Sequence, residues 1–96
     1  MAFTWDPAKR EKVLAEHKVD FDKIIDVFDD PFAVEDVDGP HSSADEIRFI
    51  IIGLTREYGL IFLAFTEMSE THLRFITARK AESWMTKVYD KARSGR

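Results

Sequence analysis

The chain has 96 residues, of which 45% are hydrophobic and 33% charged, so we expect one folded domain over residues 1–96 and not a disordered segment. The net charge of −4 does not favour a nucleic-acid partner, and the lack of cysteine excludes disulfides and thiol chemistry. The longest apolar stretches, 49–52 and 60–65, are far shorter than the about 20 residues of a membrane helix, and no signal peptide is recognisable, so we expect a cytoplasmic location.

The N-terminal third is predicted to form a short strand and two helices. Residues 3–5 indicate an edge strand, and the following Asp6 and Pro7 are typical of a helix cap and a first helical position. This first helix is expected to end at about His17, and a second helix is expected over 20–30. The apolar residues of the second helix have helical spacing and predict its buried face: Phe21, Ile24, Ile25 and Phe28.

The remainder is predicted to form consecutive strands and a C-terminal helix. The predicted strands span 32–37, 46–53, 58–66 and 72–78. Helical spacing returns at Arg79, and the expected buried face of that helix contains Ala81, Trp84, Met85, Val88 and Ala92. The predicted order is β-α-α-β-β-β-β-α, an α+β fold whose helices pack on one face of an antiparallel sheet.

The charges are distributed unevenly along the chain. The net charge is +1 over residues 1–19, −9 over 20–46 and +4 over 47–96. Such a distribution predicts a surface with an acidic and a basic region, unless the clusters arise by chance on a solvated surface.

Two arginines stand in strands that are otherwise largely apolar. Arg74 lies in the 72–78 strand, where His72, Arg74 and Ile76 are expected on one face, and Arg48 lies near the start of the first long strand. A charge in such a place must reach water or find a partner. Each arginine therefore either pairs with a carboxylate, such as Glu46 or Glu67, or is available to bind an anion.

Arg79 and Lys80 are predicted to lie in the first turn of the C-terminal helix, where the helix dipole disfavours cations. Free backbone N–H groups beside a guanidinium make a suitable phosphate site, although an exposed helix end also tolerates such a cost. Together, Arg48, Arg74 and Arg79 favour an anion-binding site. No metal-ligand spacing, phosphate loop or serine-hydrolase motif is present, so we expect neither a metal site nor a cofactor.

Several spaced motifs identify a known family. The sequence resembles the BrnT toxins of bacterial type II toxin–antitoxin systems over nearly its whole length. The motifs are Phe3-x-Trp5-Asp6-Pro7-x-Lys9, His17-x-Val19-x-Phe21, Val27-Phe28-x-Asp30-Pro31, Asp45-Glu46-x-Arg48 with Ile52-Gly53, and Arg74-x-Ile76-x-Ala78-Arg79-x-Ala81.

The resemblance implies a RelE-like fold and metal-independent RNA cleavage that inhibits translation. It also implies neutralisation by a BrnA-type ribbon-helix-helix antitoxin, in a heterotetramer that contacts operator DNA only through the antitoxin; a homodimer is the other assembly expected. We assign phosphate stabilisation to Arg48, Arg74 and Arg79, and proton transfer to His17 or Glu46. The expected RNA-binding residues are Lys9, Lys80 and Trp5.

The sequence also departs from the family pattern. Glu16 replaces a usual lysine, Val13 replaces a usual asparagine, and Ser83-Trp84-Met85 replaces positions that often hold arginine and glutamate. These changes and the acidic net charge keep a second hypothesis open: a catalytically inactive, toxin-like protein-interaction module.

Overall fold

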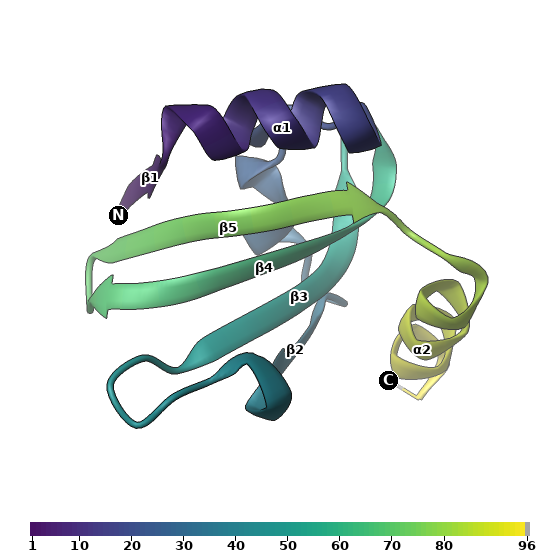
Figure 1. Cartoon of the computed structure of the whole chain (residues 1–96). Helices are drawn as coiled ribbons and strands as arrows, with labels where there is room; N and C mark the ends of the chain where they lie inside the picture. Colours follow the sequence, from purple (N-terminus) through teal and green to yellow (C-terminus); the bar gives the residue numbers. More distant parts are fainter. Residues whose placement is uncertain (96) are drawn as a thin grey trace.

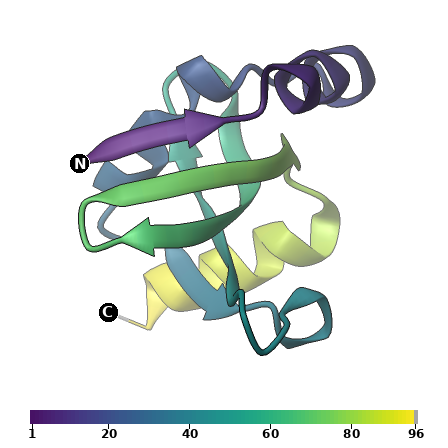
Figure 2. The same ribbon diagram turned by 60° about the vertical axis from the view of Figure 1, so that its left-hand side comes forward.

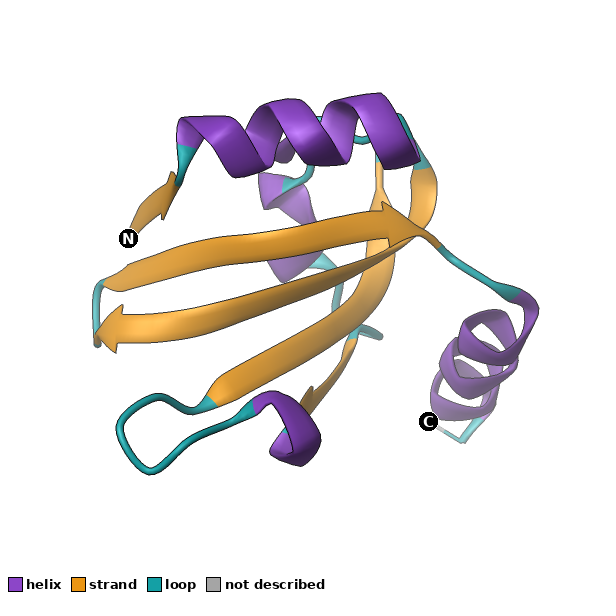
Figure 3. Cartoon of the chain, in the orientation of Figure 1, coloured by secondary structure: helices purple, strands orange, loops and turns teal. Residues whose placement is uncertain are grey.

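The computed structural model describes residues 1–95, which form a five-stranded sheet with helical segments on both sides (Figure 1). The strands are β1 (Ala2–Trp5), β2 (Val34–Val37), β3 (Arg48–Thr55), β4 (Gly59–Ser69) and β5 (His72–Lys80), in the spatial order β1-β5-β4-β3-β2. The helical segments are α1 (Pro7–His17), η1 (Phe21–Lys23), η2 (Ile25–Asp29), η3 (Gly39–His41) and α2 (Ser83–Ser94), where η denotes a 3-10 helix. Figure 3 distinguishes them from the strands by colour.

Strands β2 to β5 form the predicted antiparallel meander. The β3–β4 connection turns at Gly59, whose φ of +72° suits glycine. The predicted edge strand at residues 3–5 is present, but β1 runs parallel to β5 (Figure 2), so the sheet is mixed and not purely antiparallel. A parallel neighbour is possible here because β1 is joined to the meander through helical segments and not through a hairpin.

Helix α1 begins and ends as the sequence predicts. The Asp6 carboxylate accepts a 2.8 Å hydrogen bond from the Ala8 amide, and Pro7 occupies the first turn. Lys18 ends the helix in the left-handed region with a φ of 59°. Neither α-helix in the described part of the chain has the length and hydropathy required to cross a membrane.

The expected second α-helix is instead the pair of 3-10 segments η1 and η2. A 3-10 helix has a period of 3.0 residues, so positions three apart share a face. Accordingly Phe21, Ile24 and Val27 are completely buried, whereas Ile25 and Phe28 are only partly buried. The α-helical spacing of the apolar residues therefore gave the wrong type of helix at the right place.

The C-terminal helix begins later than predicted. Arg79 and Lys80 belong to β5, where they are paired with Phe62 and Ile61, and α2 starts at Ser83. The expectation that these two cations occupy the first helical turn is therefore wrong. The buried face also differs, since Met85 and Tyr89 are buried while Trp84 and Val88 are 49% and 39% exposed.

The helices cover both faces of the sheet and not one, as Figure 2 shows for α1 and α2. Side chains of a strand alternate between faces, and neighbours in β3 belong to different clusters. Ile51 joins the main core with η1 and η2, whereas Ile52 packs with Met85 and Tyr89 of α2. Helix α2 thus closes part of the face that the predicted fold leaves free of helices.

Candidate active site

All three candidate arginines lie on the same face of the sheet, the one that α2 partly covers. Arg48 on β3 is opposite Thr66 on β4, which is opposite Arg74 on β5. Arg79 is opposite Phe62, which packs in the α2 cluster. Because strands are spaced about 4.8 Å apart, Arg48 and Arg74 stand roughly 10 Å from each other. We call this surface the arginine face.

A β-bulge brings Arg79 to the arginine face. Arg74 and Arg79 are five residues apart, an odd separation that places side chains on opposite faces of a regular strand. The pairing of β4 with β5 shifts between Ala64 and Phe65, so that Ile76 has no partner in the register and Thr77 is opposite Ala64. Thr77, expected on the other face, consequently shares the arginine face with Arg74, and Arg79 follows it.

The main chain of Arg48 is held firmly, whereas its side chain has no partner. Its amide donates to the Ser42 hydroxyl over 2.9 Å, and its carbonyl accepts from the Asp38 amide over 2.7 Å. Among residues 1–95 the guanidinium forms no hydrogen bond or ion pair, and its Nε is buried without a partner. Neither Glu46 nor Glu67 neutralises it, so the structural ion pair considered for Arg48 is absent from the described chain.

The other two arginines differ in their availability. Arg74 is exposed, and no described side chain pairs with it. Arg79 lies over the ring of Phe62 at 4.8 Å and has its Nε 3.3 Å from Glu82 Oε1, although that nitrogen makes no hydrogen bond of acceptable geometry. Arg79 is thus already oriented by an aromatic ring and a carboxylate, while Arg48 and Arg74 are free to bind an anion.

A cavity of about 320 Å³ joins the arginine face to α1. Arg48 lines it together with Lys9, Lys12 and Glu16, which share one side of α1. On β4, between Arg48 and Thr77, the residues of this face are Ala64 and the buried Thr66. Both are almost completely buried. The complete lining is Lys9, Lys12, Val13, Glu16, Arg48, Ile76 and Thr77.

Sequence reasoning missed Lys12, Glu16 and Thr77 as members of this cavity. The helical spacing of Lys9, Lys12 and Glu16 was the available indication for the first two. His72 lies on the arginine face, two residues from Arg74, as alternation along the strand predicts, and a 2.6 Å hydrogen bond joins its Nε2 to Thr4 Oγ1.

The proton-transfer candidates lie in different places. His17 follows Glu16, and its Nε2 is 4.0 Å from Glu16 Oε2, but His17 itself is not among the residues that line the cavity of Arg48. Glu46 lines another cavity, which includes Thr66 of the arginine face but none of the three arginines. The described residues contain no group of three or more His, Asp or Glu side chains placed to hold a metal ion.

Two of the expected RNA-binding residues lie away from the arginine face. Trp5 packs against Phe21 and Phe75 in the main core, and Lys80 lies 5.8 Å from the ring of Tyr58 on the face opposite Arg79. Lys9, the third of the expected residues, lines the cavity of Arg48.

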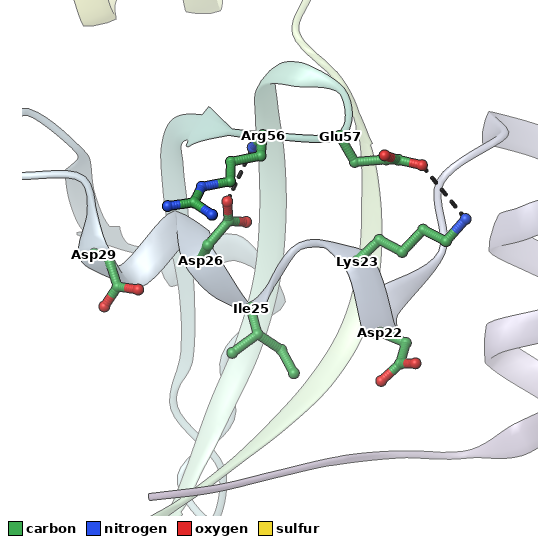
Figure 4. A pocket seen from close by; sticks show the side chains of 7 residues that line it. All are labelled: Asp22, Lys23, Ile25, Asp26, Asp29, Arg56 and Glu57. Atoms are coloured by element: carbon green, nitrogen blue, oxygen red, sulfur yellow. Dashed lines mark hydrogen bonds and ion pairs between the residues drawn. The ribbon is translucent and has the colours of Figure 1, made fainter.

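A larger, acidic cavity of about 600 Å³ lies between the 3-10 segments and the β3–β4 turn (Figure 4). Its lining is Asp22, Lys23, Ile25, Asp26, Asp29, Arg56 and Glu57. Lys23 pairs with Glu57 over 3.4 Å, and the Arg56 amide donates to Asp26 over 2.9 Å. This surface collects acids of the 20–46 segment and does not include the three candidate arginines.

The fold and the arginine positions can be compared with known proteins. The sequence model described as "Ribonuclease toxin, BrnT, of type II toxin-antitoxin system" matches residues 5–83. The chain belongs to the BrnT family. The match includes every residue of the arginine-lined cavity and all three arginines.

A solved BrnT structure supports this assignment. The chain is similar to the Brucella abortus ribonuclease toxin BrnT, with 26% identity and a TM-score of 0.65, covering 86% of this chain and 99% of the other. A comparison with curated proteins finds no match. The family is therefore that of ribonuclease toxins of type II toxin–antitoxin systems, a class that implies an antitoxin partner.

Proposed function

We propose that this BrnT-family chain is an endoribonuclease that cleaves RNA without a metal ion, and that the arginine face is its active site. The observation that carries the proposal is the position of Arg48. It lies on the same face as Arg74, lines a cavity with Lys9 and Lys12, and has a guanidinium without a protein partner among the described residues. An unpaired guanidinium beside two lysines suits a phosphate.

The chemistry requires groups of three kinds. A base takes the proton of the 2′-hydroxyl, an acid protonates the departing 5′-oxygen, and cations stabilise the charge on the phosphate in the transition state. Arg48 and Arg74 supply two cations, and Arg79 supplies a third whose charge is shared with Glu82. His17 performs proton transfer in this scheme, and Lys9 holds the RNA backbone. Glu46 is the other candidate, in a cavity that includes Thr66 but none of the three arginines.

The proposed biological role rests on the resemblance to BrnT toxins. The chain inhibits translation in the cytoplasm by cutting RNA, and a BrnA-type ribbon-helix-helix antitoxin neutralises it in a heterotetramer that contacts operator DNA through the antitoxin. The assignment to a type II toxin–antitoxin family supports a protein antitoxin. The RelE-like description of the fold belongs to the same proposal.

Purified chain, incubated with 5′-labelled single-stranded RNA in excess EDTA, tests the activity. We expect fragments that end in a 2′,3′-cyclic phosphate. Arg48→Ala and Arg74→Ala should each lower the cleavage rate about 100- to 1,000-fold, as when one transition-state donor is removed. Arg56→Ala, an exposed arginine in the acidic cavity, is the matched control and should cleave at the wild-type rate. Equal rates for all three variants would contradict an active site on the arginine face.

A catalytically inactive interaction module is the second candidate, and two observations favour it. Glu16 adds a negative charge to the cavity of Lys9 and Arg48, and Glu82 partly neutralises Arg79. Induction of the gene alone, and then with a neighbouring ribbon-helix-helix gene, separates the two functions. An active toxin arrests growth until the neighbour is expressed, whereas the module has no effect on growth at high expression.

A further inference from the structure

Trp84, in the first turn of α2, has an indole ring that lies outside both hydrophobic clusters. The side chain is 49% exposed, although its spacing in the sequence predicts burial. The buried face of α2 instead contains Met85 and Tyr89. Trp84 is also just beyond residues 5–83, so the family assignment gives it no role. Single exposed apolar side chains are common, but a half-exposed indole presents a larger flat apolar surface to a ligand than most of them do.

A single carboxylate connects Trp84 to the arginine face. The indole Nε1 donates a hydrogen bond to Glu82 Oε2 over 3.1 Å, and Glu82 Oε1 lies 3.3 Å from Arg79 Nε. Glu82 therefore orients the ring and the guanidinium at the same time. The polar group of the indole is satisfied within the protein, which leaves the apolar ring surface as the part available to a ligand.

We propose that Trp84 stacks on an unpaired base of the RNA whose phosphate groups bind the arginine face, and so acts as a positioning and specificity residue. This inference rests on the proposed ribonuclease function. A nucleotide offers a flat base beside an anionic phosphate, and Trp84 beside Arg79 offers an aromatic ring beside a cation. Stacking tolerates any base, because every base has a π-face, but it requires a base that is not stacked in a duplex.

Binding of a non-cleavable probe tests the inference without depending on catalysis. We use a fluorescein-labelled, single-stranded 2′-O-methyl RNA of mixed sequence and its duplex form. Trp84→Ala should weaken binding of the single strand about 5- to 100-fold, the usual range for loss of one stacked base, and should leave duplex binding unchanged. Trp84→Phe should retain most of the affinity. Val37→Ala, which removes a 52% exposed apolar side chain of β2 on the face opposite the arginines, is the control and should bind as wild type.

Fluorescence gives a second readout that a folding defect cannot imitate. The chain has two tryptophans, and Trp5→Phe leaves Trp84 as the one indole. Addition of the same single strand without fluorescein should quench the indole emission of this variant, because a stacked base lies in van der Waals contact with the ring.

Failure of the stacking proposal can be distinguished from failure of the ribonuclease proposal. If wild type binds the single strand and Trp84→Ala binds it equally well, the stacking role is wrong while the ribonuclease proposal stands. A Trp84→Ala variant that loses affinity only for an antitoxin would assign the ring to a protein interface and also overturn the inference. If wild type neither binds nor cleaves RNA, both proposals are wrong.

Discussion

The Tyr89 hydroxyl donates a 2.8 Å hydrogen bond to the Asp30 carboxylate, which lies 59 residues earlier in the chain. The same carboxylate accepts the Leu54 amide over 2.8 Å and the Phe32 amide over 2.9 Å. Asp30 therefore joins the end of η2, strand β3 and helix α2. This junction fixes α2 against the sheet, and α2 in turn bounds the arginine face and presents Trp84.

Tyr89→Phe should lower the free energy of unfolding by about 1.5–3 kcal/mol, because it removes a hydrogen bond to a charged acceptor. The partly buried Asp30 carboxylate then has one hydrogen-bond donor fewer. Tyr58→Phe is the matched control. The Tyr58 hydroxyl accepts from the uncharged Asp20 amide over 3.0 Å, so the expected loss is about 0.5–1.5 kcal/mol. Urea denaturation measures both variants, and an equal loss in the two would contradict a special role for the Asp30 junction.

Stability should fall in acid because two carboxyl groups are stabilised in their charged form. Hydrogen bonds from Arg10, with Nε 2.9 Å from Asp20 Oδ1, lower the pKa of Asp20. Burial raises the pKa of Asp30, but the hydrogen bonds from Leu54, Phe32 and Tyr89 outweigh it, so that pKa is also lowered. A depressed folded-state pKa stabilises the protein above the unfolded value of about 3.9, and the benefit is lost as the pH falls further. Urea midpoints measured from pH 7 to 2 should therefore decrease below about pH 4.

Folding stability should also fall at alkaline pH, for a different reason. Burial, followed by the hydrogen bond to Asp30, raises the pKa of Tyr89 to about 12. A raised folded-state pKa stabilises the protein fully below the unfolded value of about 10 and loses this contribution as the pH rises toward 12. Stability should decline over that interval in wild type and less steeply in Tyr89→Phe. Parallel alkaline curves for the two proteins would show that Tyr89 is not the responsible group.

Gly53→Ala should destabilise the fold by about 1–3 kcal/mol, the usual cost of overpacking. A Cβ at this position of β3 would lie 3.0 Å from the Ala33 and Val27 side chains and 3.3 Å from Asp30 Oδ2. Gly39→Ala is the control, because no atom lies within 4 Å of the added Cβ, and its stability should stay within about 1 kcal/mol of wild type. Thermal or urea unfolding that gives equal values for both variants would contradict the close approach at Gly53.

Local signals in the sequence predicted the parts of the fold that depend on local structure. Asp6 and Pro7 marked the start of α1, and the short connections after β3 and β4 predicted hairpins and hence the meander. Helix type and helix side were not predictable in this way. Apolar residues spaced for an α-helix suited a 3-10 helix because positions 21, 24 and 27 repeat every three residues. The side on which α2 packs depends on Tyr89 reaching Asp30, a contact between distant parts of the chain.

The candidate site, like the fold, was only partly predictable from local sequence signals. Alternation along β5 predicted that Arg74 faces away from Leu73 and Phe75, which the pairing confirms. The position of Arg79 was not predictable from the sequence. In a regular strand Arg79 would lie on the face opposite Arg74, and in a helix it would belong to another element. The bulge at Ile76 puts Arg79 on the same face as Arg74, and nothing in the sequence indicates this bulge.

His17→Gln should lower the rate of RNA cleavage about 100- to 10,000-fold, the usual contribution of a general acid or base, with little effect on RNA affinity. His17 follows Glu16, which lines the cavity of Arg48, whereas Glu46 lines a different cavity. Single-turnover cleavage of labelled RNA measures the step directly. Glu46→Gln should cleave at nearly the wild-type rate, and His41→Gln, an exposed histidine paired with Asp38, is the matched control. A large loss in His72→Gln with normal cleavage by His17→Gln would move proton transfer to the histidine that shares the arginine face with Arg74.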